Sequence, residues 1–237
     1  MATFLDLTNE LLRRLNEVTI NETDFSAVRN IQALAKDSIN SSTREILQTA
    51  QEWPFTIITY EQTLTAGQKQ YDFPANYSKA DWETFYIKKL VNNTPQKLKL
   101  ISYDQYISNY RTVEDQAEAG GYQSPQYIYM TQDSKFGVTP IPDDSYVLEY
   151  RYWIYPTDLT LSTDVCVVPD RFKHIVIDGA MMYIMRFRSN EQSAQIHEQK
   201  FKNGIESMRR LLLTSFINVT STVSIRNLQS STFGGSF

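Results

Sequence analysis

The chain is poor in the side chains on which many enzymes and metal proteins depend. Its 237 residues include one cysteine, Cys166, and two histidines, His174 and His197. A single cysteine excludes an internal disulfide. His197-Glu198 opens like a zinc-protease motif, but Phe201 stands where the second histidine ligand is needed. We therefore predict that His197 packs at the edge of a helix face and that His174 lies on the surface.

Long hydrophobic runs are also missing. The apolar stretch 175–185 is shorter than the roughly 20 residues of a membrane span, and it contains Asp178. The first residues include neither the basic nor the apolar segment of a signal peptide, so we expect no membrane association and assembly in a reducing host cytoplasm.

An excess of positive charge is the third absence. The 23 Lys and Arg residues stand against 27 Asp and Glu residues, and the formal net charge is −4. Phosphate binding needs a clustered basic surface, so this balance argues against nucleic acid as the main partner.

Sequence patterns that could belong to catalytic, metal-binding or phosphate-binding sites are explained better as core, turn or surface positions. Cys166 lies in the apolar sequence Val-Cys-Val-Val, where a thiol is a poor nucleophile and a core position is favoured. The pair Asp143-Asp144 is typical of a turn, with a weak surface cation site as the alternative. Gly120-Gly121 lacks the Gly-Lys-Ser/Thr of a phosphate loop. A local basic group is interpreted as a solvated helix face or as contacts to protein carboxylates: Arg171, Lys173, Arg186 and Arg188. We predict no catalytic residues, no cofactor and no metal.

Aromatic residues, in contrast, are abundant, at 13% of the chain with fifteen tyrosines. Tyrosine suits half-buried strands and protein interfaces, because it combines a large apolar body with a polar tip. The composition points weakly towards an interaction protein, although an ordinary β core would have a similar count.

Apolar residues recur every three or four positions near both ends of the chain, which predicts helices there. The first stripe consists of Phe4, Leu7, Leu11, Leu15 and Val18. Asp24 is predicted to cap a second helix that ends at Trp53-Pro54, since proline disfavours helix in the residue before it. A third helix after Pro169-Asp170 has a stripe of Phe172, Val176, Ala180, Tyr183 and Phe187. The fourth carries Ala194, Phe201, Ile205, Met208 and Leu212.

Between these ends the apolar period changes to two, which predicts strands. They are expected at residues 55–60, 70–73, 82–91, 96–100, 126–130, 136–138 and 146–155. We expect Ala66-Gly67 in a hairpin turn and the polar segment 114–124 in a mobile loop. We therefore predict that residues 55–155 form one antiparallel sheet or sandwich.

Residues 214–237 differ in composition from the rest. Ser, Thr and Asn are frequent, Arg226 is the only charge, and no periodic apolar face follows Leu213. We predict that this segment does not fold alone and that it orders on a partner. Alternation at Val223 and Ile225 would let a short stretch add to a partner's sheet or lie extended in a groove. Its spaced apolar residues are Phe216, Ile217, Val219, Val223, Ile225, Leu228, Phe233 and Phe237.

Together these patterns predict an α+β fold. N- and C-terminal helices form a helical layer, with a central antiparallel β-sheet or sandwich and an extended C-terminal arm. The predicted divisions are a helical domain of residues 1–54 and 157–213, a β domain of residues 55–156, and an arm of residues 214–237.

Three motifs occur in a characteristic order. A Trp-Pro-Phe step at residues 53–55 leads from the second helix into the sheet. A Pro-x-Pro-Asp turn at residues 140–143 precedes the strand Tyr-Val-Leu-Glu-Tyr-Arg-Tyr-Trp, and Val168-Pro-Asp-Arg-Phe172 then leads into a helix. This order resembles the phage head–tail adaptor proteins, also called tail tubular protein A or head-completion proteins of short-tailed phages, over nearly all of residues 1–213.

The resemblance implies a structural virion protein and no enzyme. Its subunits would form a homo-oligomeric ring, dodecameric in the family, that joins the portal protein to the tail nozzle, a tubular protein B-like component. The ring would be part of the conduit for viral genome ejection, through which DNA passes without specific binding. The resemblance also implies that residues 214–237 dock on the portal, so the eight apolar residues named above are the predicted portal-binding residues.

Two other classes of protein remain as alternatives. A carbohydrate-binding module of a tail fibre or receptor-binding protein would use exposed Tyr and Trp to stack on sugars. Many of the aromatic residues alternate within strands, however, and are more simply explained as core. A peptidoglycan hydrolase would need a convergent acid, base or metal set, which the sequence does not indicate.

Overall fold

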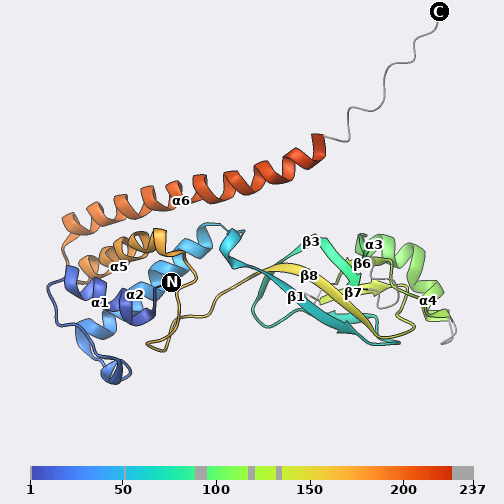
Figure 1. Ribbon diagram of the computed structural model, residues 1–237, viewed down its shortest axis with the longest axis horizontal. Coiled ribbons are helices and arrows are strands. Elements are labelled where there is room, and N and C mark those ends of the chain that lie inside the picture. The colour runs from blue at the N-terminus through green and yellow to red at the C-terminus, as the bar shows by residue number, and fades with distance from the viewer. Residues whose placement is uncertain (1, 51, 89–94, 117–120, 132–134, 226–237) are drawn as a thin grey trace, which may run out of the picture. The chain divides into compact units, whose positions relative to one another are not determined.

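The computed structural model describes residues 2–50, 52–88, 95–116, 121–131 and 135–225, and it divides the chain into two compact units (Figure 1). The helical unit comprises residues 1–56 and 156–237, and the β unit comprises residues 57–155. Both ends of the chain therefore build one unit, and the middle builds the other. Helices combined with mainly antiparallel strands confirm the predicted α+β class.

Helix α1, Phe4–Arg14, begins with a capping box. The Thr3 hydroxyl accepts a hydrogen bond from the Asp6 N–H at 3.1 Å, and the Asp6 carboxylate accepts one from the Thr3 N–H at 3.1 Å. This exchange satisfies two backbone donors and fixes where the helix starts. Leu7 and Leu11 then point into the core, as their spacing predicts.

Helix α2, Asn30–Thr49, starts later than the predicted cap at Asp24. Residues Glu22–Asp24 form a 3-10 turn, η1, and Phe25 is buried edge-to-face against Phe4 at 5.2 Å. Asn30 then has a left-handed φ of 55°. The burial of Phe25 holds the connecting segment against α1, so the helix can begin only after the chain has turned.

Helices α5, Lys173–Phe187, and α6, Glu191–Ile225, form a hairpin and lie side by side in Figure 1. A short turn, η5, Asp170–Phe172, leads into α5. The helices approach closely at Gly179, where an added Cβ would lie 2.6 Å from the Phe201 ring. Close packing of these helices therefore depends on the missing side chain.

The prediction of an extended arm is wrong for residues 214–225, because α6 continues to Ile225. No proline or glycine occurs between Ile205 and Thr232. Ser, Thr and Asn each cost less than about 1 kcal/mol relative to Ala within a helix, so they weaken a helix without ending it. The rest of the arm, residues 226–237, lies outside the described residues.

The helices of this unit enclose one apolar core, and segments from both ends of the chain meet in it. Trp53 is buried beside α2 and donates a hydrogen bond to the Ile46 carbonyl at 2.9 Å. Its buried residues include Phe4, Leu11, Ile39, Val176, Phe201 and Met208. The helical unit is thus a single packed body assembled from distant parts of the sequence.

Among the described residues, the β unit has two four-stranded sheets, of order β1-β8-β3-β4 and β2-β7-β6-β5. Of the strand pairs described there, only β5 and β6 pair in parallel. The strands are β1 Ile57–Leu64, β2 Gln70–Asp72, β3 Tyr77–Lys88, β4 Gln96–Lys97, β5 Lys99–Leu100, β6 Tyr127–Met130, β7 Lys135–Thr139 and β8 Tyr146–Ile154. Gly67, with a φ of 78°, turns the chain from the first sheet into the second. The predicted hairpin there is therefore wrong, because β1 pairs with β8 and β2 with β7.

Aromatic side chains fill the space between the two sheets. Phe85 stacks on Tyr150 at 4.6 Å, and Phe73 stacks on Tyr77 at 4.0 Å. Burial raises the pKa of Tyr150. Rings that pack on one another in this way are not available to stack on sugars, as the carbohydrate-binding alternative would require.

A helical excursion leaves the second sheet after β5. It consists of α3 Tyr103–Tyr106, a π-helical turn η3 Ile107–Arg111, and α4 Thr112–Gln116. Tyr106 stacks on Tyr129 of β6 at 3.9 Å, and the Glu114 carboxylate accepts hydrogen bonds from the Tyr106 and Thr139 hydroxyls at 3.0 and 2.5 Å. The predicted mobile loop 114–124 is therefore wrong for its first residues, which are helical and anchored. Residues 117–120 lie outside the described part of the chain.

Candidate interaction surfaces

The histidines and the cysteine lie where the sequence predicted. His197 is at a half-buried edge of α6, with its Nδ1 3.3 Å from an Asp178 oxygen that also lies 3.6 Å from Arg14. His174 is exposed, and Cys166 is buried, which raises the pKa of its thiol. Within the described residues, no three His, Cys, Asp or Glu side chains gather as metal ligands.

Asp143 and Asp144 are parts of a turn, as predicted. The Tyr146 hydroxyl donates to Asp143 at 2.7 Å, and the Ser145 N–H donates to Asp144 at 2.7 Å. The turn therefore holds its two carboxylates by local hydrogen bonds.

Across the described ranges no helix combines the length and apolar character needed to cross a membrane.

The predicted local basic group makes contacts with protein carboxylates. The ion pairs are Lys173–Glu10 at 3.2 Å, Arg186–Glu198 at 2.7 Å and Arg188–Glu17 at 2.6 Å. The Arg171 guanidinium lies over the Phe172 ring at 4.6 Å. Most of this charge is thus used within the helical unit.

Helices α1 and α5 end in the same way and beside each other. Each is followed by a residue with left-handed φ, Asn16 at 57° and Ser189 at 55°. The N–H group of the following residue then donates a hydrogen bond to a carbonyl in the last turn of the helix. The Glu17 N–H donates to the Leu12 carbonyl, and the Asn190 N–H donates to the Met185 carbonyl, both at 2.9 Å. This Schellman pattern satisfies helix carbonyls and fixes the chain direction after each helix.

Two large apolar side chains are exposed at these helix ends. Val18 is 78% exposed and Phe187 is 72% exposed, although both belong to stripes that the sequence predicts as core-facing. Asn16 ends α1 before Val18 can continue its stripe, and Phe187 is in the last turn of α5. The ion pair Arg188–Glu17 links the two ends.

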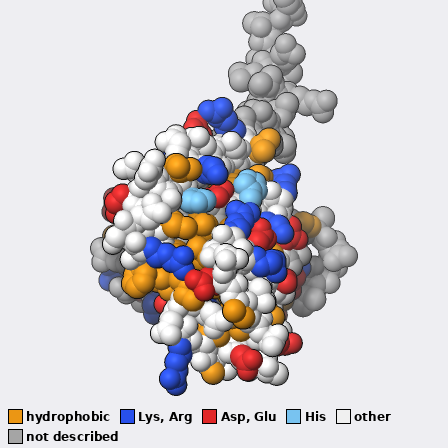
Figure 2. Space-filling model, turned by 90° about the vertical axis from the view of Figure 1, so that its left-hand side faces the viewer, with side chains coloured by type: hydrophobic (Ala, Val, Ile, Leu, Met, Phe, Trp, Pro, Cys, Tyr) orange, Lys and Arg blue, Asp and Glu red, His pale blue; other side chains and the backbone are white. Residues whose placement is uncertain are grey.

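Basic residues lie in the last turns of the two helices that end here. Arg13 and Arg14 lie in the last turn of α1, and Arg186 lies in the last turn of α5. Positive charge is favourable there because helix C-termini carry partial negative charge. We name Arg13, Val18, Arg186, Phe187 and Arg188 the basic end of the helical unit. Arg186 and Arg188 are ion-paired there with Glu198 and Glu17, so Arg13 carries the positive charge that forms no ion pair among the described residues. Figure 2, which views the left-hand side of Figure 1, shows hydrophobic side chains intermixed with Lys and Arg and with Asp and Glu side chains on this face.

A second exposed apolar pair lies at the opposite end of α1. Leu161 is 63% exposed and Val165 is 46% exposed. Their segment is fixed to the start of α1, because Val165 pairs with Thr3 in an isolated β-bridge and the Phe4 N–H donates to the Asp164 carbonyl at 2.8 Å. The position of both apolar side chains relative to α1 is therefore well determined.

Acidic side chains accompany this second pair. The Asp164 carboxylate accepts hydrogen bonds from the N–H groups of Thr160 and Leu161, both at 2.7 Å, and these bonds lower its pKa. Glu22 lies close by, with its Oε1 3.5 Å from the Ser162 hydroxyl. We name Glu22, Leu161, Asp164 and Val165 the acidic end of the helical unit.

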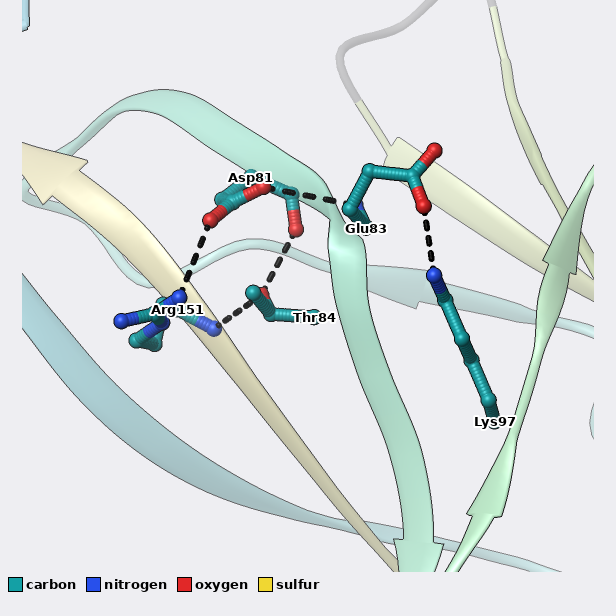
Figure 3. A network of polar contacts seen from close by, with 5 residues as sticks. All are labelled: Asp81, Glu83, Thr84, Lys97 and Arg151. Atoms are coloured by element: carbon teal, nitrogen blue, oxygen red, sulfur yellow. Dashed lines mark hydrogen bonds and ion pairs between the residues drawn. The ribbon is translucent and has the colours of Figure 1, made fainter. Parts of the chain in front are cut away.

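The β unit presents charged side chains at a bulge in β3. Asp81 pairs with Arg151 of β8, but the next paired residue of β3 is Tyr86, opposite Glu149. The Thr84 hydroxyl accepts a hydrogen bond from the Arg151 N–H at 3.0 Å and donates one to the Asp81 carbonyl at 2.7 Å (Figure 3). The threonine thus replaces ladder bonds that the bulge removes.

Two ion pairs at the bulge lie on the surface. Asp81 is 3.5 Å from Arg151, and Glu83 is 2.5 Å from Lys97 of β4 (Figure 3). The Glu83 side chain is 79% exposed. A bulge changes the direction of side chains locally, and here it turns the Glu83 side chain towards solvent.

The predicted portal-binding residues divide into two groups. Phe216, Ile217, Val219, Val223 and Ile225 belong to α6, so the predicted strand-like alternation at Val223 and Ile225 does not apply. Leu228, Phe233 and Phe237 lie outside the described residues. Along the helical backbone, the positions of Leu212, Phe216, Val219 and Val223 continue the three- and four-residue spacing of Phe201, Ile205 and Met208.

Comparison with known protein families gives a match to the SU10 adaptor protein family over residues 2–224. The match includes both units and most of α6. No curated protein matches the chain.

Proposed function

The chain belongs to the SU10 adaptor protein family, and from that premise we propose that it is a ring-forming head-to-tail adaptor between the portal and the tail nozzle. The family is one of phage structural adaptors, so the chain is a virion component that acts by binding. The observation that carries the proposal is the extent of the match, which includes the helical unit, the β unit and α6 rather than one module. The ring would form part of the conduit for the genome.

We assign portal docking to the C-terminal part of α6. The face that packs on α5 contains Phe201, Ile205 and Met208, which are all buried. At the same spacing, this face continues along the backbone through positions 212, 216, 219 and 223. An amphipathic helix that extends beyond its own fold is a common means of binding a groove in a partner.

Truncation after Leu213 tests this assignment. The shortened chain keeps the contacts of Phe201, Ile205 and Met208, so we expect it to remain folded and to lose binding to portal. Burying three apolar side chains at about 1.5–3 kcal/mol each is enough to make their removal visible in a binding titration. Portal binding at full strength by the truncated chain would refute the assignment.

A pair of full-length variants separates helical docking from extended docking. Phe216, Val219 and Val223 share one helix face, whereas Ile217 and Ile225 lie off it. Helical docking predicts that replacing the first set with serine abolishes portal binding and that replacing the second set leaves it nearly unchanged. Extended docking predicts that both sets weaken it. The off-face variant is therefore the matched control.

We assign contact with the distal tail component to the β unit. This unit carries the charged bulge of β3, and residues 116–122 connect its α4 to β6. The flanks of that segment are anchored, at Glu114 and through the Gln123 N–H to the Ile141 carbonyl at 2.9 Å. Deleting residues 116–122 should therefore leave the fold and portal binding intact while weakening nozzle attachment. Unchanged virion assembly by the deletion variant would count against this role.

A further inference from the structure

We propose that copies of this chain associate head to tail, with the basic end of one helical unit docked on the acidic end of the next. The proposal rests on the ring-forming function above and names the surfaces that would make the ring contact. Its basis is the placement of two different exposed apolar pairs at opposite ends of one helix, each near charges of opposite sign that form no ion pair among the described residues.

The geometry requires two copies. Helix α1 has 11 residues, which corresponds to about 16 Å at 1.5 Å per residue. Val18 and Phe187 lie at its C-terminal end, whereas Leu161 and Val165 lie at its N-terminal end, so the two pairs cannot meet within one copy. A contact between two different surfaces is heterologous, and repeating it produces a closed ring when the rotation closes.

Charge supports the pairing of unlike ends. Arg13 at the basic end and Asp164 and Glu22 at the acidic end form no ion pair within the described part of the chain. A contact of either end with its own kind would bring Arg13 towards a second Arg13, or Asp164 and Glu22 towards their own copies, which is unfavourable at an interface. Contact between unlike ends brings Arg13 towards Asp164 and Glu22 and covers both apolar pairs.

The rigidity of both ends also favours this role. Schellman bonds fix the basic end, and the Thr3–Val165 bridge and the Asp164 turn fix the acidic end. Exposed apolar side chains on rigid backbone lose little conformational freedom when they are covered. The chain has thus two preformed, unlike surfaces on one compact unit.

Cysteine cross-linking gives a direct test in the full-length chain. Cys166 is the only native cysteine, and Cys166→Ala removes it from the reaction. In that background, the double variant Phe187→Cys with Leu161→Cys should give a ladder of oligomers larger than dimers after oxidation on portal. Phe187→Cys alone and Leu161→Cys alone should stay monomeric, and an equimolar mixture of the two should give dimers only.

The control replaces Leu161→Cys with Ile196→Cys, an apolar side chain of α6 that is 52% exposed and lies near the basic end, two residues from Glu198, the ion-pair partner of Arg186. Phe187→Cys with Ile196→Cys should form no ladder. A ladder in this control, or dimers of Phe187→Cys alone, would overturn the proposal, since either shows contacts other than basic end to acidic end.

Charge exchange provides a second test without cysteines. Arg13→Glu alone and Glu22→Arg alone should each lower ring yield on portal at least tenfold, and the double variant should restore it. Failure of the double variant to restore the yield would also overturn the pairing.

The experiments distinguish a wrong adaptor function from a wrong assignment of the ring-contact surfaces. Rings of the unmodified chain on portal, seen by electron microscopy, without any cross-linked ladder would overturn the proposed surfaces and leave the adaptor function standing. An unmodified chain that forms no ring on portal would refute the adaptor function itself.

Discussion

Substitution of Gly179 by alanine should destabilise the helical unit, and the structure gives the sign. A Cβ at this position would lie 2.6 and 2.9 Å from two atoms of the buried Phe201 ring and would also collide with the Ser42 hydroxyl. That hydroxyl donates to the Val176 carbonyl at 2.9 Å, so it cannot turn away without losing a buried hydrogen bond. Two neighbouring helices would have to separate from α5.

Two opposing terms set the magnitude. Alanine gains about 1 kcal/mol over glycine in helix propensity. Overpacking a filled core costs about 1–3 kcal/mol. We expect Gly179→Ala to lower the free energy of unfolding by up to about 2 kcal/mol, and a loss of 1 kcal/mol corresponds to about 2–4 °C in Tm for a chain of this size. Urea titration followed by circular dichroism at the helical band measures the change.

Gly204→Ala is the matched control in the same helical hairpin. The three atoms nearest to its added Cβ all belong to the Ile175 side chain, at 2.9 to 3.3 Å, while the gain in helix propensity is the same. We expect a smaller loss of stability than for Gly179→Ala, so the difference between the two variants reports the closer contacts with Ser42 and Phe201. Adding Ser42→Ala to Gly179→Ala should recover part of the loss. A Gly179→Ala chain as stable as the native one would refute the reasoning.

Three further predictions each concern one side chain: Asp6, Glu114 and Cys166. The hydrogen bonds from Thr3 hold the pKa of Asp6 below its ordinary value of 3.8, so Asp6 stabilises the fold above that pH. This contribution should disappear as the pH falls through the lowered pKa, and Asp6→Asn should flatten the acid limb of a plot of Tm against pH. Glu114→Ala leaves two hydroxyl donors without their acceptor and should cost about 1–3 kcal/mol in urea titration, whereas Glu114→Gln should cost less. Burial raises the pKa of the Cys166 thiol, so a thiol-reactive dye at pH 8 should label it only in denaturant.

The strands could be predicted because their pattern is local and regular. In β8, Leu148, Tyr150 and Tyr152 are buried at alternate positions, and that alternation is visible in the sequence. The first residues of β3, Tyr77–Asp81, were missed because polar side chains dominate them. Their strand conformation comes from pairing with β8, which no local pattern reveals.

Helix ends were harder to predict than helices. Periodicity assigns Val18 and Phe187 to apolar stripes, and nothing in that pattern shows where the backbone leaves the helix. The left-handed turns at Asn16 and Ser189 decide this. The pair Ser189-Asn190 does predict the end of α5, because both residue types favour turns and helix caps, whereas the end of α1 at Asn16 was placed too late. The end of α6 was misplaced for the opposite reason, since a polar composition was interpreted as a loss of helix although neither proline nor glycine follows Ile205 until after Thr232.

The two proposed contacts explain each other when their strengths are compared. The head-to-tail contact covers a few apolar side chains, at about 1.5–3 kcal/mol each. Association costs about 4–15 kcal/mol in lost freedom, so this contact alone is too weak to hold two free copies together. Docking of α6 on portal removes most of that cost, because copies held on one symmetric partner meet at a high effective concentration. The same weak contact then closes the ring on portal and leaves the free chain monomeric, which restricts assembly to the place where the ring is needed.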